Sequence, residues 1–368
     1  MRISQIDVYQ VDLPYSGGTY TLSGGRSYTS FDATFVRITT DDGLMGWGES
    51  TPFGSTYIAA HARGVRAGIE EIAPHLIGMD PRHVDRINEA MDDALVGHHH
   101  AKTPIDMACW DVFGKAVNMP VCDLLGGRTQ EKLPLISSIY TDEPNEMRAR
   151  VQQHREKGYT AHSVKVGDDP ALDAARLTAA LADRRPGEFF LADANGGMTV
   201  EQALRMLRLL PAGLDFVLEA PCATWRECVS LKRRTDVPIL WDELGDSEEA
   251  IAQLISEDAA DGIGLKISKN GGLTRCRRQR DMCIAAGYTM SVQDTTGSDI
   301  TFAAIVHMAQ TIPKKYLRSV LGAPDMVALK TADGDFNVVD GHVQAPDSPG
   351  LGITPRMDVM GEPIATYS

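Results

Sequence analysis

The chain has 368 residues, of which 43% are hydrophobic and 23% charged, and it carries a formal net charge of −14. This length suggests two domains or one large α/β unit with an attachment, and the ordinary composition excludes a wholly disordered chain and a coiled coil. The acidic balance disfavours nucleic acid and anionic membranes as partners. The sequence has no apolar run of about 18 residues, so no membrane span is predicted.

Six cysteines are scattered through the sequence without paired spacing: Cys109, Cys122, Cys222, Cys228, Cys276 and Cys283. This spacing indicates reduced, mostly buried thiols, not a zinc site or a disulfide framework. The first residues alternate like a strand and lack the apolar core of a signal peptide. We therefore expect a cytoplasmic protein.

The first part of the chain mixes strand and helix patterns. Alternating residues at 3–13 and 34–40 predict strands, and a turn at 41–43 leads into a further strand at 44–48. Periodic apolar residues predict helices over 59–76, 83–95 and 104–118. The polar, glycine-rich stretch 15–28 between the strands is typical of a functional loop or lid.

From residue 133 onward, short apolar runs alternate with amphipathic helical patterns. Eight such runs begin at residues 133, 162, 189, 216, 238, 262, 288 and 315. Repeated strand–helix units of this kind predict a parallel (β/α) barrel, whereas an open doubly wound sheet, the alternative, more usually has fewer strands. We predict an α+β N-terminal capping domain at 1–125, the barrel at 126–325, and a C-terminal segment at 326–368 that packs back on the capping domain.

Five consecutive predicted strands, the second to the sixth, end in a charged residue: Lys165, Asp193, Glu219, Asp242 and Lys266. In a barrel these ends lie on one face, where functional residues gather. Three clustered carboxylates repel one another unless a cation lies among them, and all-oxygen ligands favour Mg²⁺. A single acid at a strand end is more often a helix cap, but charged ends on five successive strands favour a site.

The two lysines flank the three acids, one strand to each side, and this arrangement predicts a specific chemistry. Mg²⁺ acidifies the α-proton of a bound carboxylate, because it stabilises the enediolate that deprotonation forms. A lysine removes that proton only when its amine is neutral, and nearby positive charge with partial burial lowers its pKa toward this state. Lysines on opposite faces allow inversion of the carbon, whereas a β-hydroxyl on the substrate allows loss of water.

Further motifs extend along nearly the whole chain. They are Trp47-Gly48-Glu49, residues 105–111 (IDMACWD) with 124–127 (LLGG), residues 193–196 (DANG), 218–221 (LEAP) and 241–243 (WDE), and Lys266 ahead of 271–274 (GGLT). Together they resemble the enolase superfamily, in its muconate-lactonizing-enzyme-like branch (mandelate racemase/muconate lactonizing enzyme), a superfamily in which a lysine or histidine base works with Mg²⁺.

This resemblance implies a modified (β/α) barrel with a capping domain and one Mg²⁺ per active site. Asp193, Glu219 and Asp242 would hold the metal, and Lys165 and Lys266 would be the acid/base pair. The substrate would be a small carboxylate or amino acid, and we expect a homo-oligomer, because members of the family form dimers to octamers.

One departure from the family pattern concerns the second strand, which commonly ends Lys-x-Lys and here reads Ser163-Val164-Lys165. The lysine that the family uses as a base is retained as Lys165. Loss of the neighbouring cation should leave the pKa of Lys165 higher, which suits an ammonium that donates a proton to a leaving hydroxyl. Alternatively, Ser163 is a packing change without functional meaning.

Weaker candidates for substrate binding or support of the site are Ser163, Asn195, Glu243, Asp294, Tyr20 and Tyr57. Lys269, like Glu243, lies beside a predicted site residue. Asp294 follows the seventh strand and would either bind a substrate ammonium or cap the next helix. The two tyrosines lie where the capping domain of the family covers its site. The run 98–100 (HHH) is interpreted as a solvated turn before a helix, not a metal cluster.

The eighth strand reads Arg318-Ser319-Val320 and lacks the Asp-x-Asp that dipeptide epimerases of this branch use. With Ser163, this pattern resembles members that act on hydroxyproline or proline betaine. The resemblance implies a cis-3-hydroxy-L-proline dehydratase, a lyase, with 2-epimerisation as a competing outcome. The alternatives are a proline or hydroxyproline betaine racemase-epimerase, an N-acyl-amino-acid or dipeptide epimerase, a muconate-type cycloisomerase, and a non-catalytic metal-bound scaffold.

Overall fold

A computed structural model describes residues 1–21 and 26–368 of the chain. Four residues of the predicted loop or lid, 22–25, therefore lie outside the described residues. On either side of them, the strands β2 (Tyr20–Thr21) and β3 (Ser27–Tyr28) pair with each other as a short antiparallel ladder.

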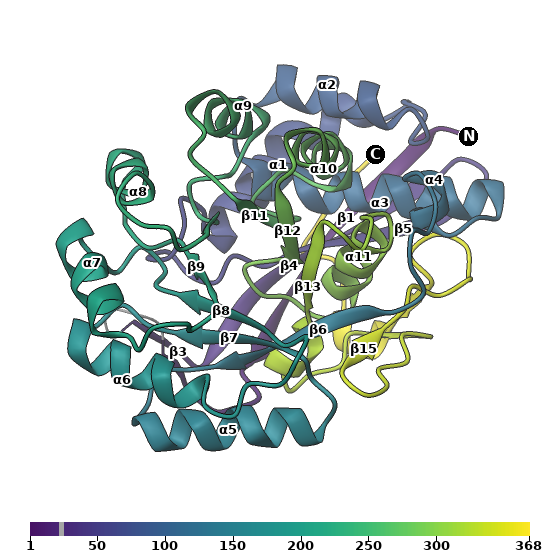
Figure 1. Cartoon of the computed structure of the whole chain (residues 1–368). Coiled ribbons are helices and arrows are strands. Elements are labelled where there is room, and N and C mark those ends of the chain that lie inside the picture. The colour runs from purple at the N-terminus through teal and green to yellow at the C-terminus, as the bar shows by residue number, and fades with distance from the viewer. Residues whose placement is uncertain (22–25) are drawn as a thin grey trace.

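Among the described residues, eight parallel strands form a closed barrel (Figure 1), because the last strand pairs with the first. In order around the barrel they are β6 (Leu133–Ile139), β7 (Ala161–Lys165), β8 (Phe189–Asp193), β9 (Val217–Glu219), β10 (Ile239–Trp241), β11 (Gly262–Lys266), β12 (Thr289–Gln293) and β13 (Leu317–Leu321). The predicted barrel is confirmed, and the open sheet is wrong.

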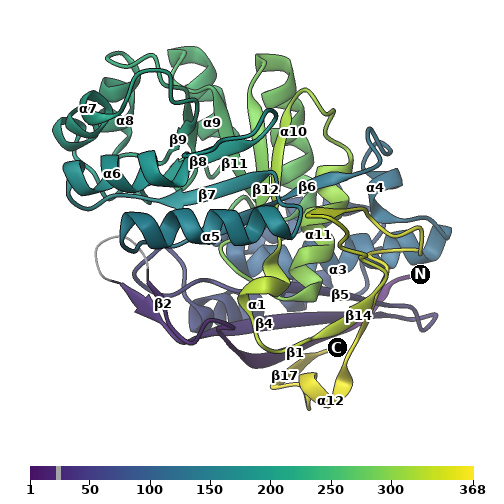
Figure 2. The same cartoon turned by 60° about the horizontal axis from the view of Figure 1, so that its bottom comes forward.

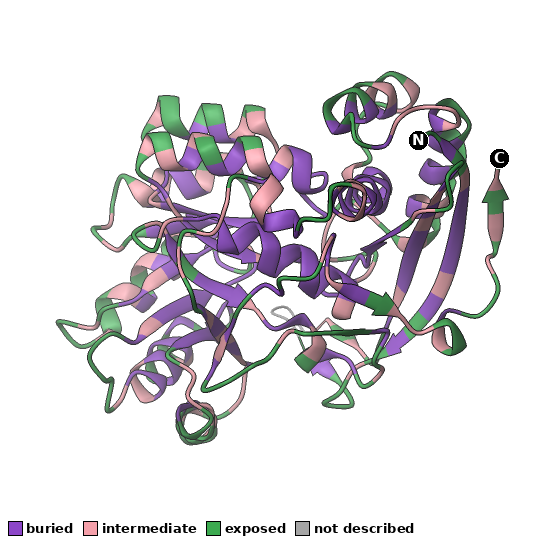
Figure 3. Ribbon diagram, turned by 90° about the vertical axis from the view of Figure 1, so that its right-hand side faces the viewer, coloured by how far each residue is buried: buried purple, intermediate pink, exposed green. Residues whose placement is uncertain are grey.

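A helix follows each strand from β6 to β12, and these helices surround the barrel (Figure 1). They are α5 (Pro144–Glu156), α6 (Pro170–Ala180), α7 (Val200–Leu209), α8 (Trp225–Lys232), α9 (Glu248–Glu257), α10 (Leu273–Ala286) and α11 (Asp299–Gln310). Side-chain oxygens of Thr199, Thr224 and Ser247 accept backbone N–H groups and so cap the start of α7, α8 and α9. The outer faces of the helices around the barrel are exposed, whereas the barrel strands are buried (Figure 3).

The N-terminal region forms a separate antiparallel sheet with three helices. The sheet has the strand order β17 (Ala365–Tyr367), β1 (Ile3–Pro14), β4 (Ser30–Thr40) and β5 (Met45–Ser50). The helices are α1 (Ala62–Leu76), α2 (Val84–Ala94) and α3 (His99–Val117), followed by the short α4 (Val121–Leu124). Figure 2 shows the long strands beneath the barrel, with the C-terminal strand beside β1.

The rest of the chain after the barrel is made of short elements. They are η2 (Ala323–Met326), β14 (Ala332–Gly334), β15 (His342–Val343), β16 (Ile353–Pro355) and α12 (Met357–Met360). β14 pairs with β16, and β15 adds to barrel strand β6. This part of the chain therefore contacts both the barrel and the N-terminal sheet. No helix in the described ranges is long and apolar enough to cross a membrane.

α3 begins at His99, five residues before the predicted start at Pro104. A proline inside a helix leaves a carbonyl without its N–H donor. Here that carbonyl belongs to His100, and the Thr103 hydroxyl donates to the neighbouring carbonyl of His99 at 3.0 Å. The helix is buried along most of its length, so packing against other elements supports it in spite of the proline. The interpretation of 98–100 as a solvated turn was wrong for His100, which is buried and bonded to Ser50 at 3.0 Å.

Two glycines let β5 approach α3 closely. A Cβ on Gly46 would lie 2.1 Å from the Ala108 carbonyl oxygen, and one on Gly48 would lie 2.0 Å from that of Pro104. Next to them, the buried Glu49 accepts the backbone N–H groups of Ser298 and Thr301 at 2.9 Å each. The motif that resembles the family's capping-domain strand thus joins this sheet to the start of α11.

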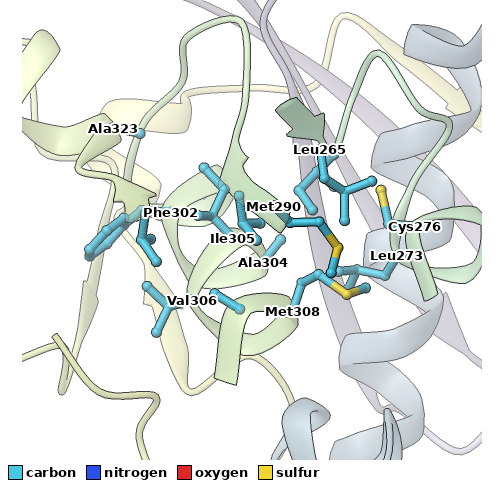
Figure 4. Packing of buried hydrophobic residues seen from close by; sticks show 14 of the residues in the cluster. Leu265, Leu273, Cys276, Met290, Phe302, Ala304, Ile305, Val306, Met308 and Ala323 are labelled. Carbon is cyan, nitrogen blue, oxygen red and sulfur yellow. The ribbon is translucent and has the colours of Figure 1, made fainter. Parts of the chain in front are cut away.

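The N-terminal sheet and helices α1 to α3 are called the cap below. The core between the barrel and the cap is centred on α11, a helix buried on almost every side. Figure 4 shows apolar side chains of α11 packed with Leu265 and Met290 from the barrel strands and with Leu273 and Cys276 from α10. A helix that is apolar all round has to be covered by other elements on all faces. This packing fixes the cap over the carboxyl ends of the strands.

Candidate active site

The five charged residues predicted at strand ends lie at the carboxyl ends of neighbouring barrel strands. Lys165, Asp193, Glu219 and Lys266 are the last residues of β7, β8, β9 and β11, and Asp242 directly follows β10. All five are buried, with 7% or less of their surface exposed. Buried ionisable groups are costly unless they are paired, so their partners decide what the site can do.

The two lysines lie across the barrel from each other. Three strands separate β7 from β11 on one side (β8, β9 and β10) and three on the other (β12, β13 and β6). Lys165 and Lys266 therefore end strands at opposite positions of the barrel rim. A molecule bound between these strands would have one amine toward each face.

Each lysine pairs with one carboxylate. Lys165 Nζ forms an ion pair with Asp193 and donates to Asn195 Oδ1 at 2.9 Å. Lys266 Nζ lies 2.5 Å from Asp242 Oδ2 and donates to the Tyr57 hydroxyl at 2.6 Å. These contacts connect the lysines to the acids that were predicted as metal ligands.

The lysine pKa values differ from the expectation that burial and nearby positive charge would lower them. Burial does lower the pKa of each amine, but the charge of Asp193 raises that of Lys165 and the charge of Asp242 raises that of Lys266, and both end above their ordinary value. The reason is that each ammonium lies against a carboxylate group. Both amines are protonated in this state.

Asp242 is held by a second lysine from the neighbouring loop. Lys269 is buried, and its Nζ donates to the main-chain carbonyl of Asp242, to Asp242 Oδ1 at 3.2 Å, and to the carbonyls of Gly245 and Gly264 at 3.3 Å. Burial raises the pKa of Asp242, but Lys266 and Lys269 lower it below its ordinary value. Asp242 is therefore an ionised carboxylate in a fixed position.

Glu219 has a different environment. Its Oε1 accepts a hydrogen bond from Gln293 Nε2 at 3.0 Å. Burial raises its pKa well above the ordinary value, and the charges of Asp193 and Asp242 raise it further. The three acids are thus near enough to repel one another, which is the electrostatic condition for binding a cation.

The absence of a side chain on Gly264 lets two of these acids lie close to the strand. A Cβ at this residue would lie 2.9 Å from Gln293 Nε2 and 3.2 Å from both Asp242 Oδ1 and Glu219 Oε1. Oxygen donors that converge on one space fit a hard divalent ion such as Mg²⁺. In the described part of the chain, however, no three His, Cys, Asp or Glu side chains are already arranged as a metal site. The ion pairs explain this, because Lys165 and Lys266 hold two of the acids.

Backbone strain marks the same strand ends. Asn195 and Ala220 are not glycines, yet they have φ angles of 44° and 40°. Such angles are unfavourable for residues with a side chain and gather at functional sites. The Gly196 N–H donates to the Ala220 carbonyl at 2.8 Å, which ties the loops after β8 and β9 together.

A cavity of about 610 Å³, including its opening to solvent, lies above these strand ends. Of the predicted residues, its lining includes Tyr20, Tyr57, Ser163, Lys165, Asp193, Glu219, Lys266 and Asp294. The aromatic part comes from the cap, where Phe53 packs against Tyr20 and Tyr57 with ring centroids 5.2 and 5.5 Å apart. The structure therefore brings cap tyrosines and barrel lysines to one space.

Asp294 is buried in the cavity wall. Its Oδ2 accepts both the backbone N–H and the hydroxyl of Ser268, at 2.9 and 2.8 Å, and its Oδ1 accepts the Thr295 N–H at 2.7 Å. Burial raises its pKa to about 6, although these hydrogen bonds oppose the shift. It is therefore an anion at neutral pH and does not cap the following helix through these bonds.

Asn195 and Glu243 meet beside the main cavity. Asn195 Nδ2 donates to Glu243 Oε1 at 3.0 Å, while Asn195 Oδ1 accepts from Lys165. Glu243 therefore contacts the lysine only through Asn195. Burial raises the pKa of Glu243, and the charge of Asp242 adds to the increase.

Gln293 was not among the predicted site residues. It lies at the end of β12, directly before Asp294, and donates to Glu219. Its position at a strand end is a usable signal, but an uncharged amide there is less conspicuous in a sequence than a charged residue. Ser291 and Ser319, which also line the cavity, point to the same omission, because both are uncharged polar residues on barrel strands.

Comparisons with known proteins agree with this fold. Residues 25–126 match the model of the mandelate racemase/muconate lactonizing enzyme N-terminal domain, and residues 146–359 match the enolase C-terminal domain-like model. A cis-3-hydroxy-L-proline dehydratase from Roseibium aggregatum is 44% identical over 368 residues, 100% of both chains.

Two solved structures are similar over the whole chain. One, described as of the mandelate racemase/muconate lactonizing enzyme type and from Aspergillus oryzae, is 66% identical with a TM-score of 0.96, covering 100% of this chain and 99% of that one. Another of this type, from Roseovarius nubinhibens and complexed with magnesium, is 53% identical with a TM-score of 0.98 and 100% coverage of both. The chain therefore belongs to the enolase superfamily, in its mandelate racemase/muconate lactonizing enzyme branch, and is an enzyme of that family.

Proposed function

We propose that this enzyme removes the α-proton of cis-3-hydroxy-L-proline and eliminates the 3-hydroxyl as water, with 2-epimerisation as a side reaction. The observation that carries the proposal is the pair of buried lysines at opposite positions of the barrel rim, on either side of one cavity. The 44% identity to the Roseibium aggregatum dehydratase, over the full length of both chains, supports the substrate.

Asp193, Glu219 and Asp242 would hold one Mg²⁺, since they offer only carboxylate oxygens and lie near enough for the charges of Asp193 and Asp242 to raise the pKa of Glu219. When bound, the ion would stabilise the negative charge that develops on the substrate carboxylate during deprotonation. The magnesium in the Roseovarius nubinhibens structure supports this choice of ion.

One lysine would act as the base and the other as the acid. An amine takes up a proton only when neutral, so the base must first lose the stabilisation that its paired carboxylate gives to the ammonium. The other lysine, still protonated, would deliver its proton to the leaving hydroxyl or to the opposite face of the α-carbon. The first course gives dehydration and the second gives inversion.

Asp294 would recognise the ring ammonium of the substrate, because it is a buried anion in the cavity wall. The other wall residues favour an amino acid over a diacid. Among the described residues of the lining there is no arginine, and Arg318 of β13 is exposed and lies over Phe189 with 5.8 Å from its guanidinium carbon to the ring centroid.

The test is proton exchange in D₂O, followed by NMR, with Mg²⁺ and a panel of proline derivatives. We expect α-deuteration and loss of the 3-hydroxyl with cis-3-hydroxy-L-proline, and no reaction after treatment with a chelator. Lys266→Met and Lys165→Met should each lower the rate by roughly 10²–10⁴-fold, the usual contribution of a positioned acid or base. If neither exchange nor elimination occurs with any member of the panel, the chain is better described as a metal-bound scaffold.

A further inference from the structure

A second cavity adjoins the first at the ends of β8, β9 and β10. It measures about 940 Å³, including its opening to solvent, and Tyr57 lines both cavities. Its other walls include Asn195, Trp241 and two cysteines, Cys222 and Cys228. The mechanism proposed above does not use these thiols.

The two cysteines are close neighbours. Cys222 lies in the loop after β9, and Cys228 lies in the first half of α8. Both are 2% exposed, and both are among the residues that line the cavity. The Cys228 thiol donates to the Cys222 carbonyl at 3.3 Å, and the interaction between the two thiols is the largest cause of their pKa shifts.

Cys228 differs from the other cysteines in its acidity. Its hydrogen bond with the Cys222 thiol lowers its pKa, although burial and the nearby Glu227 and Glu243 act against this. The same hydrogen bond and burial raise the pKa of Cys222. Burial also raises the pKa of the remaining four thiols: to about 12 for Cys122 and Cys283, and well above the ordinary value for Cys109 and Cys276.

We propose that Cys222 and Cys228 are a redox modification site, at which a hydroperoxide converts the two thiols into a disulfide. The Cys228 thiolate attacks one oxygen of the peroxide, which breaks the O–O bond, forms a sulfenic acid and releases the other oxygen as hydroxide. The Cys222 thiol then attacks the Cys228 sulfur, the S–S bond forms, and the sulfenic oxygen leaves as water. The thiols lose two electrons and the peroxide gains them.

The disulfide would disturb the ends of two strands that carry acids of the active site. Cys222 lies three residues after Glu219, beyond the strained Ala220. Its loop is joined to the loop after β8 through the bridge between Cys222 and Gly197 and through the Met198 N–H, which donates to the Pro221 carbonyl at 3.1 Å. A shift of Cys222 toward Cys228 therefore pulls on the backbone next to Glu219 and Asp193. This consequence for catalysis rests on the proposed function.

The experiment treats the reduced full-length protein with hydrogen peroxide near stoichiometry and measures intact mass and peptide maps. The expected result is loss of the mass of two hydrogen atoms, a cross-link between the peptides that contain Cys222 and Cys228, and reversal by dithiothreitol. Fluorescence gives a second readout, because Trp241 lines this cavity and packs against Trp225 with ring centroids 4.6 Å apart. A cross-link between other cysteines, or none at peroxide levels that oxidise methionine, overturns the proposal.

Matched variants identify the attacking thiol. Cys222→Ser should stop at a Cys228 sulfenic acid that dimedone traps, whereas Cys228→Ser should leave Cys222 unlabelled by dimedone. Cys283→Ser, a change of a thiol buried elsewhere, should leave the cross-link intact. Dimedone labelling of Cys222 in Cys228→Ser that equals the labelling of Cys228 in Cys222→Ser would contradict the assignment.

The effect on catalysis is measured separately. Oxidation should lower the Mg²⁺-dependent proton exchange at least tenfold, and reduction should restore it. Full activity of the cross-linked protein would overturn the coupling to the active site. The mass readout does not depend on turnover, so a failure of the proposed function and a failure of the thiol pair give different results.

Discussion

At the scale of single residues, the site balances buried charges in pairs. Lys165 lies against Asp193, and Lys266 and Lys269 lie against Asp242, while Glu219 accepts from the amide of Gln293. A buried acid without a cation at hydrogen-bond distance is the one whose ionised form gains most from a bound metal ion. The raised pKa of Glu219, caused by burial and by the two neighbouring acids, fits that role.

The first prediction concerns Lys269→Met. The variant keeps the length of the side chain but removes the donor to Asp242 and to the carbonyls of Gly245 and Gly264. Loss of a partner that orients a metal ligand commonly weakens metal affinity about 10–100-fold. We therefore expect the Mg²⁺ concentration for half-maximal activity to rise by this factor, measured by titration of the metal-free enzyme. Lys157→Met, at an exposed residue, is the control, and an unchanged Mg²⁺ requirement in Lys269→Met would contradict the role.

The second prediction concerns the pH dependence of Asp294. Burial raises its pKa to about 6. Its carboxylate is therefore charged above pH 6 and becomes neutral as the pH falls through 6, which removes its attraction for a substrate ammonium. We expect kcat/KM to fall below this pH through a rise in KM.

Asp294→Asn should remove this acid limb and raise KM roughly tenfold or more at neutral pH, because a hydrogen bond to a charged group contributes about 1.5–3 kcal/mol. The measurement is a pH profile of kcat and KM for both proteins. A profile whose acid limb is the same in the variant would exclude Asp294 as its source.

At the scale of elements, the sequence predicted the barrel strands well. The start of each apolar run lies within two residues of a strand start, from β6 at Leu133 to β13 at Leu317. Buried parallel strands are short, apolar and bounded by helices, so their pattern is local. The start of α3 was misplaced for the same reason, since Pro104 is a local signal for a helix start, whereas tertiary packing allows the helix to begin at His99.

Contacts between distant residues were not available from the pattern. Gln293 and Glu219 are 74 positions apart, and Lys266 and Tyr57 are 209 apart. The positions of the strand ends predicted which charged residues would lie together, but not which of them would form ion pairs. For this reason the gathering of the five charged residues at one end of the barrel was predictable, whereas the ion pairs between them were not.

The third prediction tests how β5 is joined to α11. Glu49 is fully buried and accepts four hydrogen bonds, from the Thr51 hydroxyl, the Ser298 N–H and hydroxyl, and the Thr301 N–H. Glu49→Gln would turn an NH₂ group toward one hydroxyl and one backbone N–H; the hydroxyl can accept from the NH₂ group, but the backbone N–H is left unpaired. We expect a loss of about 1–3 kcal/mol in the free energy of unfolding, measured with urea, which is the usual cost of an unsatisfied buried donor. The control is Glu131→Gln at an exposed position, and equal stability of the two variants would refute this account.

At the scale of the whole molecule, the cap and the C-terminal residues close around the barrel through polar contacts of long sequence separation. His307 of α11 is one such junction. Its Nδ1 accepts the Cys122 N–H and its Nε2 donates to the Leu351 carbonyl, both at 3.1 Å. The main-chain donor at Nδ1 fixes the neutral ring, because a second proton there would face an N–H group.

The last prediction follows from the sign of this interaction. Burial lowers the pKa of His307 from 6.5 to about 4, and burial lowers those of His162 and His100 to about 4 and 3. Above pH 6.5 these histidines are neutral in the folded and unfolded states. As the pH falls from 6.5 toward 4, these histidines become protonated in the unfolded chain but stay neutral in the folded protein. The free energy of unfolding therefore decreases over this range, by roughly 3 kcal/mol for His307 alone.

His307→Gln keeps one acceptor for Cys122 and one donor for Leu351 but does not titrate. The free energy of unfolding, measured with urea between pH 7 and pH 4.5, should therefore fall less steeply in this variant. At the acid end, the number of protons taken up on unfolding should be lower than in the parent by about one. His75→Gln, at an exposed position, controls for replacing a histidine outside the core. If His307→Gln and the parent lose stability with the same slope, His307 takes up its proton as readily in the folded protein as in the unfolded chain. The neutral ring would then not be what joins α11 to Cys122 and Leu351.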